Sequence, residues 1–380
     1  MSVNYNVLGL IFASMHDSYV SELTLRRTMG SIPFGGRYRL IDFPLSNFVN
    51  SGVTEVGVIT KSNYGSLLDH LGSGREWDLA RKKGGLHLLP PYSQTGNTGG
   101  IYKGRLDAMN NVWSFIEHSS AKYVICANAD VVKTIDFNKV LAQHKETEAD
   151  VTVVYQKAAY DSSVNKCATI LEFDEDKRLT AALVEPQLSG ECNVWLEMLI
   201  INKETLNKIV PDAASRGEYS FTRTIMQEKN KELKIVGYEH CGKFMHIDSI
   251  SNYYKANMAL LDTDTRASLF KDNRPVFTKV GDSAPVKYGL ESSIKNSFIA
   301  DGCIIEGTVE NSVLFRGVKV GKGAVVKDSI LMQGTKVGAD CELKGVITDK
   351  NAVIGDGNHI NGSEASPTYI KKDSNIAPQV

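Results

Sequence analysis

The sequence predicts an α/β protein in which a doubly wound, mostly parallel sheet is followed by a parallel β-helix. Up to about residue 260, short β-branched runs alternate with longer stretches of helical apolar spacing. That alternation is typical of a parallel sheet with helices on both faces. After about residue 290, aliphatic-glycine pairs recur every 17 residues, at Val320-Gly321, Val337-Gly338 and Ile354-Gly355. A fixed short period of this kind is typical of a parallel β-helix.

Length, composition and charge are those of an ordinary globular protein. The chain has 380 residues, 42% hydrophobic and 23% charged, and is long enough for more than one domain. Its 43 basic and 44 acidic residues give a formal net charge of −1, which argues against a nucleic-acid partner. The N-terminal run MSVNYNVLGLIF has no basic segment or cleavage site and is too short to span a bilayer, so we expect a cytoplasmic protein without a membrane partner.

The six cysteines are spread widely along the chain and include no C-x-x-C pair. Their spacing predicts neither a zinc site nor a disulfide framework. We expect reduced, mostly buried thiols at Cys126, Cys167, Cys192, Cys241, Cys303 and Cys341.

The first domain is predicted from apolar periodicity. Strands are expected over 6–10, 53–60, 122–130 and 150–156, helices over 106–118, 137–148 and 251–262, a hairpin over 167–186 and an apolar run over 196–202. Ligands bind at the carboxyl ends of parallel strands, so the loops after residues 12, 60 and 130 are where we expect chemistry.

The repeat region predicts flat coils that stack on one another. Val326 lies six residues after Val320, and Leu343 lies six after Val337. An antiparallel sandwich would instead need alternation with a period of two. Because few coils are present, their exposed edges predict oligomerisation. The expected domains are 1–262 and 291–380, joined by a linker over 263–290 that is rich in Pro, Gly and charge.

Long motifs indicate a family. IPFGGRYRLIDFPLSNFVNSGVTEVGVIT (32–60) closely resembles the P-F-G-G-K/R-Y-R-x-I-D-F-x-L-S-N signature of ADP-glucose pyrophosphorylases, also called glucose-1-phosphate adenylyltransferases. The resemblance continues through 89–108, 129–137 and 296–332 and covers essentially the whole chain. It implies a Rossmann-like nucleotidyltransferase domain followed by a left-handed β-helix. It also implies attack of glucose 1-phosphate on the α-phosphorus of ATP, assisted by Mg²⁺ and cationic side chains.

The phosphate loop departs from the family pattern L-A-G-G-x-G-T-R-L. Aligned through the following Leu-Thr, the chain has Ser14, Met15 and Asp17 at the three glycines and Tyr19 at the arginine. Met29 stands where the family has a lysine. Side chains fill the space in which bare amides would wrap the phosphates, and a carboxylate repels an anion. The resemblance therefore implies a degenerate phosphate loop.

Other substrate positions are retained in part. The family's G-T-A-D-A corresponds to GRLDA (104–108), with the threonine and first alanine enlarged, and V-E-K-P corresponds to VEP (184–186), without its lysine. The remnants of the substrate site are Tyr102, Gly104, Asp107, Asp130 and Glu185. Capping and packing are the structural alternatives for these residues.

The two family carboxylates that hold Mg²⁺ are reduced to one. Asp130 corresponds to the first, whereas His246 falls on the second, and imidazole is a poor ligand for Mg²⁺. Asp248 could substitute only if the strand stays regular, and a structural role is favoured for His246. The resemblance thus implies no intact catalytic residues, no metal site and no cofactor.

Together these losses resemble the GlgD-type companion subunit that accompanies a catalytic GlgC-type subunit. This predicts a regulatory, catalytically deficient subunit in a heterotetramer, within bacterial glycogen biosynthesis. The alternative is an active transferase with a divergent site, in which Mg²⁺ is used and Arg26, Arg27 and Arg105 replace the missing cations. A metabolite sensor without an enzyme partner is the third possibility.

A basic cluster within 61–85 comprises Arg75, Arg81, Lys82 and Lys83. A solvated basic face is the ordinary interpretation of such a cluster. The alternative is a regulatory pocket for sugar-phosphate or nucleotide effectors.

Overall fold

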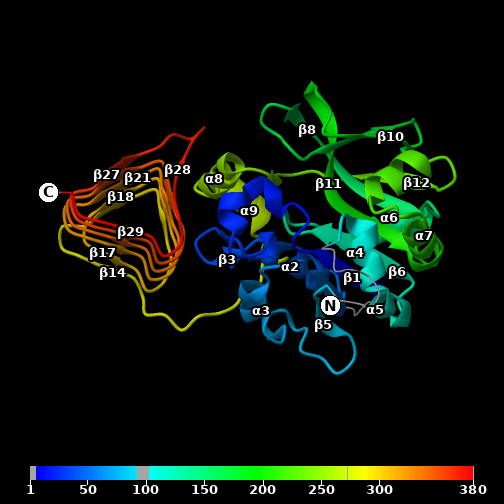
Figure 1. Cartoon of the computed structure of the whole chain (residues 1–380), viewed down its shortest axis with the longest axis horizontal. Helices are drawn as coiled ribbons and strands as arrows, with labels where there is room; N and C mark the ends of the chain where they lie inside the picture. Colours follow the sequence, from blue (N-terminus) through cyan, green and yellow to red (C-terminus); the bar gives the residue numbers. More distant parts are fainter. Residues whose placement is uncertain (1–5, 92–101, 272, 380) are drawn as a thin grey trace.

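A computed structural model describes residues 6–91, 102–271 and 273–379. The second motif of the family resemblance (89–108) and the N-terminal run lie partly outside these ranges. Figure 1 shows a mixed α/β part joined to a coil of triangular section, in which the C-terminal strands are stacked in layers. The predicted fold class is confirmed.

The central sheet of the first part has the strand order β10-β9-β11-β6-β1-β4-β5, and β8 pairs with both β11 and β12. Its strands are β1 (Val7–Phe12), β4 (Glu55–Ile59), β5 (Gly85–Leu89), β6 (Tyr123–Asn128), β8 (Val151–Asp161), β9 (Thr169–Phe173), β10 (Leu179–Val184), β11 (Ser189–Asn202) and β12 (Ile235–Glu239). Strands β1, β4, β5 and β6 are parallel, whereas β11 runs antiparallel to β6, β8 and β9. The sheet is therefore mixed at one side.

Both faces of the sheet are buried, which explains why β1 is apolar without interruption. Leu8, Leu10 and Phe12 enter one core cluster, whereas Val7 and Ile11 enter the other. Successive side chains of a strand point to opposite faces, so a strand covered on both sides needs apolar residues at every position.

Helices cover these faces and the junction with the second part (Figure 1). They are α1 (Ser21–Thr24), α2 (Asp42–Asn50), α3 (Gly65–Leu71), α4 (Arg105–Asn111), α5 (Trp113–His118), α6 (Phe137–Glu146), α7 (Lys203–Arg216), α8 (Ile250–Ala259) and α9 (Thr263–Leu269), with a π-helix over Thr222–Glu228. Two short ribbons are β2 (Pro33–Phe34) with β3 (Tyr38–Arg39), and β7 (Val131–Val132) with β13 (Met245–His246).

Most predicted elements are present with slightly different ends. The predicted hairpin is β9 with β10, which are antiparallel. The helix predicted over 106–118 is two helices, because the backbone leaves helical geometry at Val112 (φ −107°, ψ 19°). All six cysteines are unpaired thiols and four are buried, as predicted. In the described ranges, no helix is long and apolar enough to cross a bilayer.

The C-terminal part is a parallel β-helix with three flat sides. One side stacks β14 (Lys287–Tyr288), β17 (Ile304–Ile305), β20 (Lys319–Val320), β23 (Lys336–Val337), β26 (Val353–Ile354) and β29 (Asn375–Ile376). The second stacks β15 (Ser293–Lys295), β18 (Thr308–Glu310), β21 (Val325–Lys327), β24 (Glu342–Lys344) and β27 (His359–Asn361). The third stacks β16 (Phe298–Ile299), β19 (Val313–Leu314), β22 (Ile330–Leu331), β25 (Val346–Thr348) and β28 (Thr368–Ile370).

The 17-residue repeat is the length of chain that makes one coil of the β-helix. Val320 is in register with Val337, which is in register with Ile354. Val326 and Leu343, the residues six positions on, are paired on the second side. The predicted spacing of six residues is confirmed, because residues six positions apart supply buried aliphatic side chains to successive sides of the coil.

The segment 263–290, predicted as a linker without periodicity, contains regular structure at both ends. Helix α9 occupies Thr263–Leu269 and buries Leu269, and β14 opens the first coil at Lys287. Asp262 caps α9, since its carboxylate accepts a hydrogen bond from the Thr265 amide. The sequence signal of this helix is its capping residue and not an apolar stripe. The search for apolar periodicity therefore did not predict α9.

Candidate functional site

The candidate site lies at the carboxyl ends of β1 and β6, where the loops after residues 12 and 130 were expected to carry chemistry. The loop after β1 holds Ser14, Met15, Asp17 and Tyr19, and Asp130 follows β6. Strand β13 lies next to β7 and brings His246 to the same edge.

The first side chains of the phosphate loop contact neighbouring parts of the protein, by a hydrogen bond at Ser14 and by packing at Met15. Ser14 is buried, and its hydroxyl accepts a hydrogen bond from the Lys61 amide at 3.0 Å. Met15 packs against the core cluster that contains Phe12. The loop is thus fastened by its own side chains.

Asp17 bonds to the chain where the family has a lysine. Its Oδ1 accepts a hydrogen bond from the Met29 amide at 2.9 Å, and burial raises the pKa of this carboxyl to about 6. The Met29 side chain is only 1% exposed and belongs to a core cluster with Val20 and Leu23. Met29 therefore serves packing and does not line the site.

Tyr19 reaches the remnant of the sugar-phosphate site. Its hydroxyl donates a hydrogen bond to Glu185, and burial together with this carboxylate raises the pKa of Tyr19. Glu185 has a positive φ of 47°, just beyond β10. Tyr19, which stands at the family's arginine position, is thus hydrogen-bonded to Glu185, which matches the carboxylate of the family's V-E-K-P motif.

Asp130 is surrounded by two histidines and a thiol. The His16 ring contacts the Asp130 carboxylate directly, His246 Nε2 lies 3.5 Å from Asp130 Oδ2, and Cys167 Sγ lies 3.5 Å from His246 Nε2. Asp130 and Cys167 are 2% and 6% exposed. We call these four residues the Asp130 cluster.

Charges within the Asp130 cluster stabilise one another. Burial opposes ionisation of Asp130, but His16 and His246 lower the pKa of this carboxyl far below its ordinary value. Burial likewise opposes the charged form of His246, but Cys167 and Asp130 raise its pKa well above that of free histidine. Burial raises the pKa of the Cys167 thiol.

Asp248 does not join this cluster. Strand β13 ends at His246, and the Asp248 carboxylate accepts hydrogen bonds from the Lys166 amide at 2.8 Å and from the Asn252 side chain at 2.5 Å. It therefore does not substitute for the family's second carboxylate.

Magnesium, which the family resemblance implies, does not fit these residues. Mg²⁺ prefers oxygen ligands in octahedral geometry. The Asp130 cluster has only one carboxylate, and its other groups, two imidazoles and a thiol, are ligands of softer metals.

The remaining substrate remnants are held by local structure. Tyr102 is buried, and a β-carbon at Gly104 would collide with the Tyr219 carbonyl group, 2.9 Å from its carbon. Asp107 accepts a hydrogen bond from the Lys103 amide at the start of α4. The structure does not bring these residues into the Asp130 cluster.

The three arginines considered as replacement cations are paired elsewhere. Arg105 is buried against Glu197, and its guanidinium lies 4.7 Å from the Trp195 ring centroid. Arg27 binds Asp349 of the β-helix, and Arg26 pairs with Asp373 at 3.2 Å. The expectation that they line a phosphate site is not supported by their contacts.

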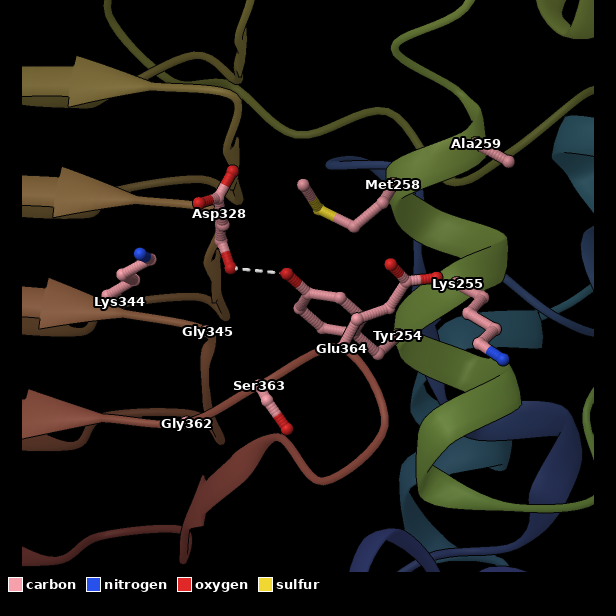
Figure 2. A pocket seen from close by; sticks show the side chains of 10 residues that line it. All are labelled: Tyr254, Lys255, Met258, Ala259, Asp328, Lys344, Gly345, Gly362, Ser363 and Glu364. Carbon is pink, nitrogen blue, oxygen red and sulfur yellow. Dashed lines mark hydrogen bonds between the residues drawn. The ribbon is translucent and has the colours of Figure 1, made fainter.

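Several cavities lie away from the Asp130 cluster. One of about 570 Å³ lies between α8 and the β-helix, where Tyr254 donates a hydrogen bond to the Asp328 carbonyl at 2.6 Å (Figure 2). Its charged side chains are balanced in sign: Lys255, Lys344, Asp328 and Glu364. It has no excess of positive charge that would select an anion.

The second cavity, of about 440 Å³, involves part of the basic cluster. Arg75 and Arg81 line it together with Trp77 and Phe277, but Arg81 is paired with Asp78. Lys82 and Lys83 are exposed and do not line this cavity.

Lys133, three residues after Asp130, gives a testable pH dependence. It is 1% exposed, its ammonium donates a hydrogen bond to Gln156 at 2.7 Å, and burial lowers its pKa to about 7. The folded protein thus binds this proton less tightly than the unfolded chain, so the free energy of unfolding should rise between about pH 7 and 10. Lys133→Met should reduce that rise by on the order of a few kcal/mol in denaturant titrations. The exposed Lys139→Met is the matched control, and equal slopes in the two variants would contradict the assignment.

The sequence analysis did not identify His16 and Cys167 as residues of the site. His16 lies 114 residues from Asp130, and Cys167 lies 79 residues from His246. The only available signal was the place of His16 inside the degenerate loop. The cysteine spacing carried no signal, because the tertiary fold alone brings Cys167 to His246.

Comparisons with known proteins agree with this architecture. Residues 18–261 match the nucleotidyl transferase family, and residues 285–367 match the GlmU-like C-terminal hexapeptide family, as expected for a left-handed β-helix. The chain is 37% identical to the glycogen biosynthesis protein GlgD of Bacillus subtilis over 97% of this chain and 96% of that protein. It is 34% identical to a glucose-1-phosphate adenylyltransferase of Clostridium perfringens over 84% of this chain and 83% of that enzyme. The chain therefore belongs to the nucleotidyl transferase family, alongside GlgD and the glucose-1-phosphate adenylyltransferases.

Proposed function

We propose that this protein is a regulatory, catalytically deficient subunit of glucose-1-phosphate adenylyltransferase in bacterial glycogen biosynthesis. It acts by assembling with a catalytic, GlgC-type subunit into a heterotetramer. The likeness to the glycogen biosynthesis protein GlgD supports the assignment to this pathway.

One observation carries the loss of catalysis: the phosphate loop binds the remnants of its own substrate site. His16 contacts the residue that matches the family's first metal ligand, and Tyr19 contacts the residue that matches its sugar-site carboxylate. Asp17 adds a carboxyl that accepts a hydrogen bond from the Met29 amide. A bound triphosphate would have to break these contacts and would then meet side chains in place of amides.

The first coil of the β-helix offers a surface for the partner. Strands β14 and β15 lie at the ends of their sheets, so one side of each has no neighbouring strand among the described residues. Tyr288, Leu290 and Ile294 on this coil are 53%, 107% and 38% exposed. An unpaired strand edge beside exposed apolar side chains favours association.

Regulation requires that the assembly distinguish two states of the catalytic subunit. This chain changes the partner's activity only if it binds one of those states more tightly than the other. The intact β-helix supplies the binding surface, and the degenerate site is not used for turnover.

Pyrophosphate release tests the proposal. The purified chain, given Mg²⁺, ATP and glucose 1-phosphate, should release no pyrophosphate above the uncatalysed background, because its loop excludes the triphosphate. Added to a catalytic subunit from the same organism, it should change that subunit's turnover or its response to metabolites. Robust turnover by the chain alone, with these or other nucleotides and sugar phosphates, would establish the divergent active transferase instead.

A restored loop is the matched control for this assay. The variant carries Ser14→Gly, Met15→Gly, Asp17→Gly, Tyr19→Arg and His246→Asp, and it keeps Met29, which packs in the core. It should bind ATP more tightly than the native chain, as measured by calorimetry. If folded variant protein shows no gain, the loop is not what excludes the nucleotide.

A further inference from the structure

We infer that the Asp130 cluster is a site for a divalent metal ion of the zinc class, in place of the magnesium site implied by the family. This inference does not rest on the regulatory role proposed above, because metal content is measured on this chain alone. It rests on the positions and chemistry of His16, Asp130, Cys167 and His246.

The four ligand atoms are arranged at the spacing of a tetrahedral zinc site. They all lie within 4.8 Å of one another. With zinc-ligand bonds of about 2.0–2.3 Å, the edges of a tetrahedron are about 3.3–3.8 Å long. The distances from His246 Nε2 to Asp130 Oδ2 and to Cys167 Sγ are both 3.5 Å. The direct His16–Asp130 contact is shorter than such an edge and has to open for an ion to enter, and any ligand atoms that lie as far as 4.8 Å apart have to move closer.

The ligands come from four separate parts of the chain. His16 lies in the loop after β1, Asp130 between β6 and β7, Cys167 just before β9 and His246 in β13. The backbone fixes two of them, because the Ile247 amide donates a hydrogen bond to the Asp130 carbonyl at 2.9 Å and β13 pairs with β7. An ion would therefore fasten the degenerate loop to the edge of the sheet.

Burial and charge also suit a bound ion. Among the described residues, Asp130 Oδ1 is a buried oxygen without a hydrogen-bond partner, although buried carboxylate oxygens normally have one. A divalent ion bound by the Asp130 carboxylate, the Cys167 thiolate and two neutral imidazoles has no net charge, which lowers the cost of burial. On binding, the Cys167 thiol and the charged His246 imidazole each release a proton to water, which leaves a thiolate and neutral imidazole ligands.

The donor set selects the class of metal. Imidazole and thiolate bind Zn²⁺ and Co²⁺ well and Mg²⁺ poorly. Four protein ligands leave no open position for a reacting water, so the site is structural and not catalytic. The residue that removes the family's second carboxylate, His246, is thus the same residue that supplies a zinc-class ligand.

Metal analysis of the full chain tests this inference. Protein stripped with a chelator, loaded with Zn²⁺ and passed through a desalting column should retain one equivalent of zinc, even when excess Mg²⁺ is present. Loading with Co²⁺ should give the visible absorption of a tetrahedral cobalt site and a sulfur-to-cobalt charge-transfer band. Zinc should also raise the melting temperature, because it binds only the folded cluster.

Variants separate this site from adventitious binding. Cys167→Ser and His16→Asn should lose the retained zinc and the charge-transfer band, whereas the exposed Cys241→Ser should keep both. His16 is 19% exposed, so its variant is expected to fold, and circular dichroism checks each protein. Absence of retained zinc in the native chain, or equal zinc in the Cys167→Ser and Cys241→Ser proteins, would overturn the inference and leave a purely hydrogen-bonded cluster.

Discussion

Asp349→Ala should lower the free energy of unfolding by about 3–5 kcal/mol, because it leaves a buried arginine without its counter-charge. Arg27 Nη2 donates hydrogen bonds to both Asp349 oxygens, at 2.6 and 2.9 Å, and each side chain is 3% exposed. The Tyr369 hydroxyl donates a further hydrogen bond to the same carboxylate at 2.8 Å. The pair joins the first domain to the β-helix, so the substitution should also loosen the junction. Denaturant titration with tryptophan fluorescence and circular dichroism measures both effects.

The neighbouring ion pair provides a matched control. Arg26 and Asp373 link the same two domains at 3.2 Å, but their side chains are 60% and 47% exposed. Solvent screens such a pair, so Asp373→Ala should change stability by at most about 1 kcal/mol. If the two alanine variants were equally stable, burial would not be what makes the Arg27–Asp349 pair matter. An Arg27→Met, Asp349→Leu double variant should recover much of the loss, since it removes both charges.

Gly338→Ala should destabilise the β-helix by more than about 3 kcal/mol, because the coils are stacked too closely for a side chain at this corner. A β-carbon at Gly338 would lie 2.7 Å from the Asp356 amide nitrogen and 2.8 Å from the Gly355 carbonyl carbon. These are backbone atoms of the next coil, so no rotamer change relieves the contact. Thermal and denaturant unfolding should show early loss of the C-terminal domain.

Gly317→Ala distinguishes close stacking from backbone strain in the same domain. Gly317 has a φ of +70° but nothing lies within 4 Å of a β-carbon placed there. Alanine should therefore cost only the left-handed conformation, about 1–2 kcal/mol. A larger loss at Gly317 than at Gly338 would show that conformation, and not the approach of coils, limits these corners.

The family signature over 32–60 has a structural role that the sequence alone did not reveal. Asn47 donates a hydrogen bond to the Lys133 carbonyl at 2.8 Å and accepts one from the Ile135 amide at 3.0 Å. It thereby holds the chain that follows Asp130. The signature can persist in a chain with a degenerate phosphate loop, because part of it maintains the framework of the site.

The sequence by itself determined the two architectures of this protein. Short β-branched runs alternating with helical stretches predicted a parallel sheet with helices on both faces, and the 17-residue period predicted the stacked coils of a parallel β-helix. Both are local properties, because strand and coil periodicities are set within a few residues of chain. The losses at Ser14, Met15, Asp17 and Tyr19 were likewise visible from alignment with the family pattern.

Only the tertiary structure decided where the altered side chains went. Asp130 meets His16 and His246, and Arg27 meets Asp349 from 322 positions away, because the sheet order and the docking of the β-helix bring those segments together. No periodicity encodes such contacts, since they depend on which loops share one edge of the sheet. The sequence therefore predicted the loss of a magnesium site, whereas the fold showed that Asp130 lies among nitrogen and sulfur neighbours.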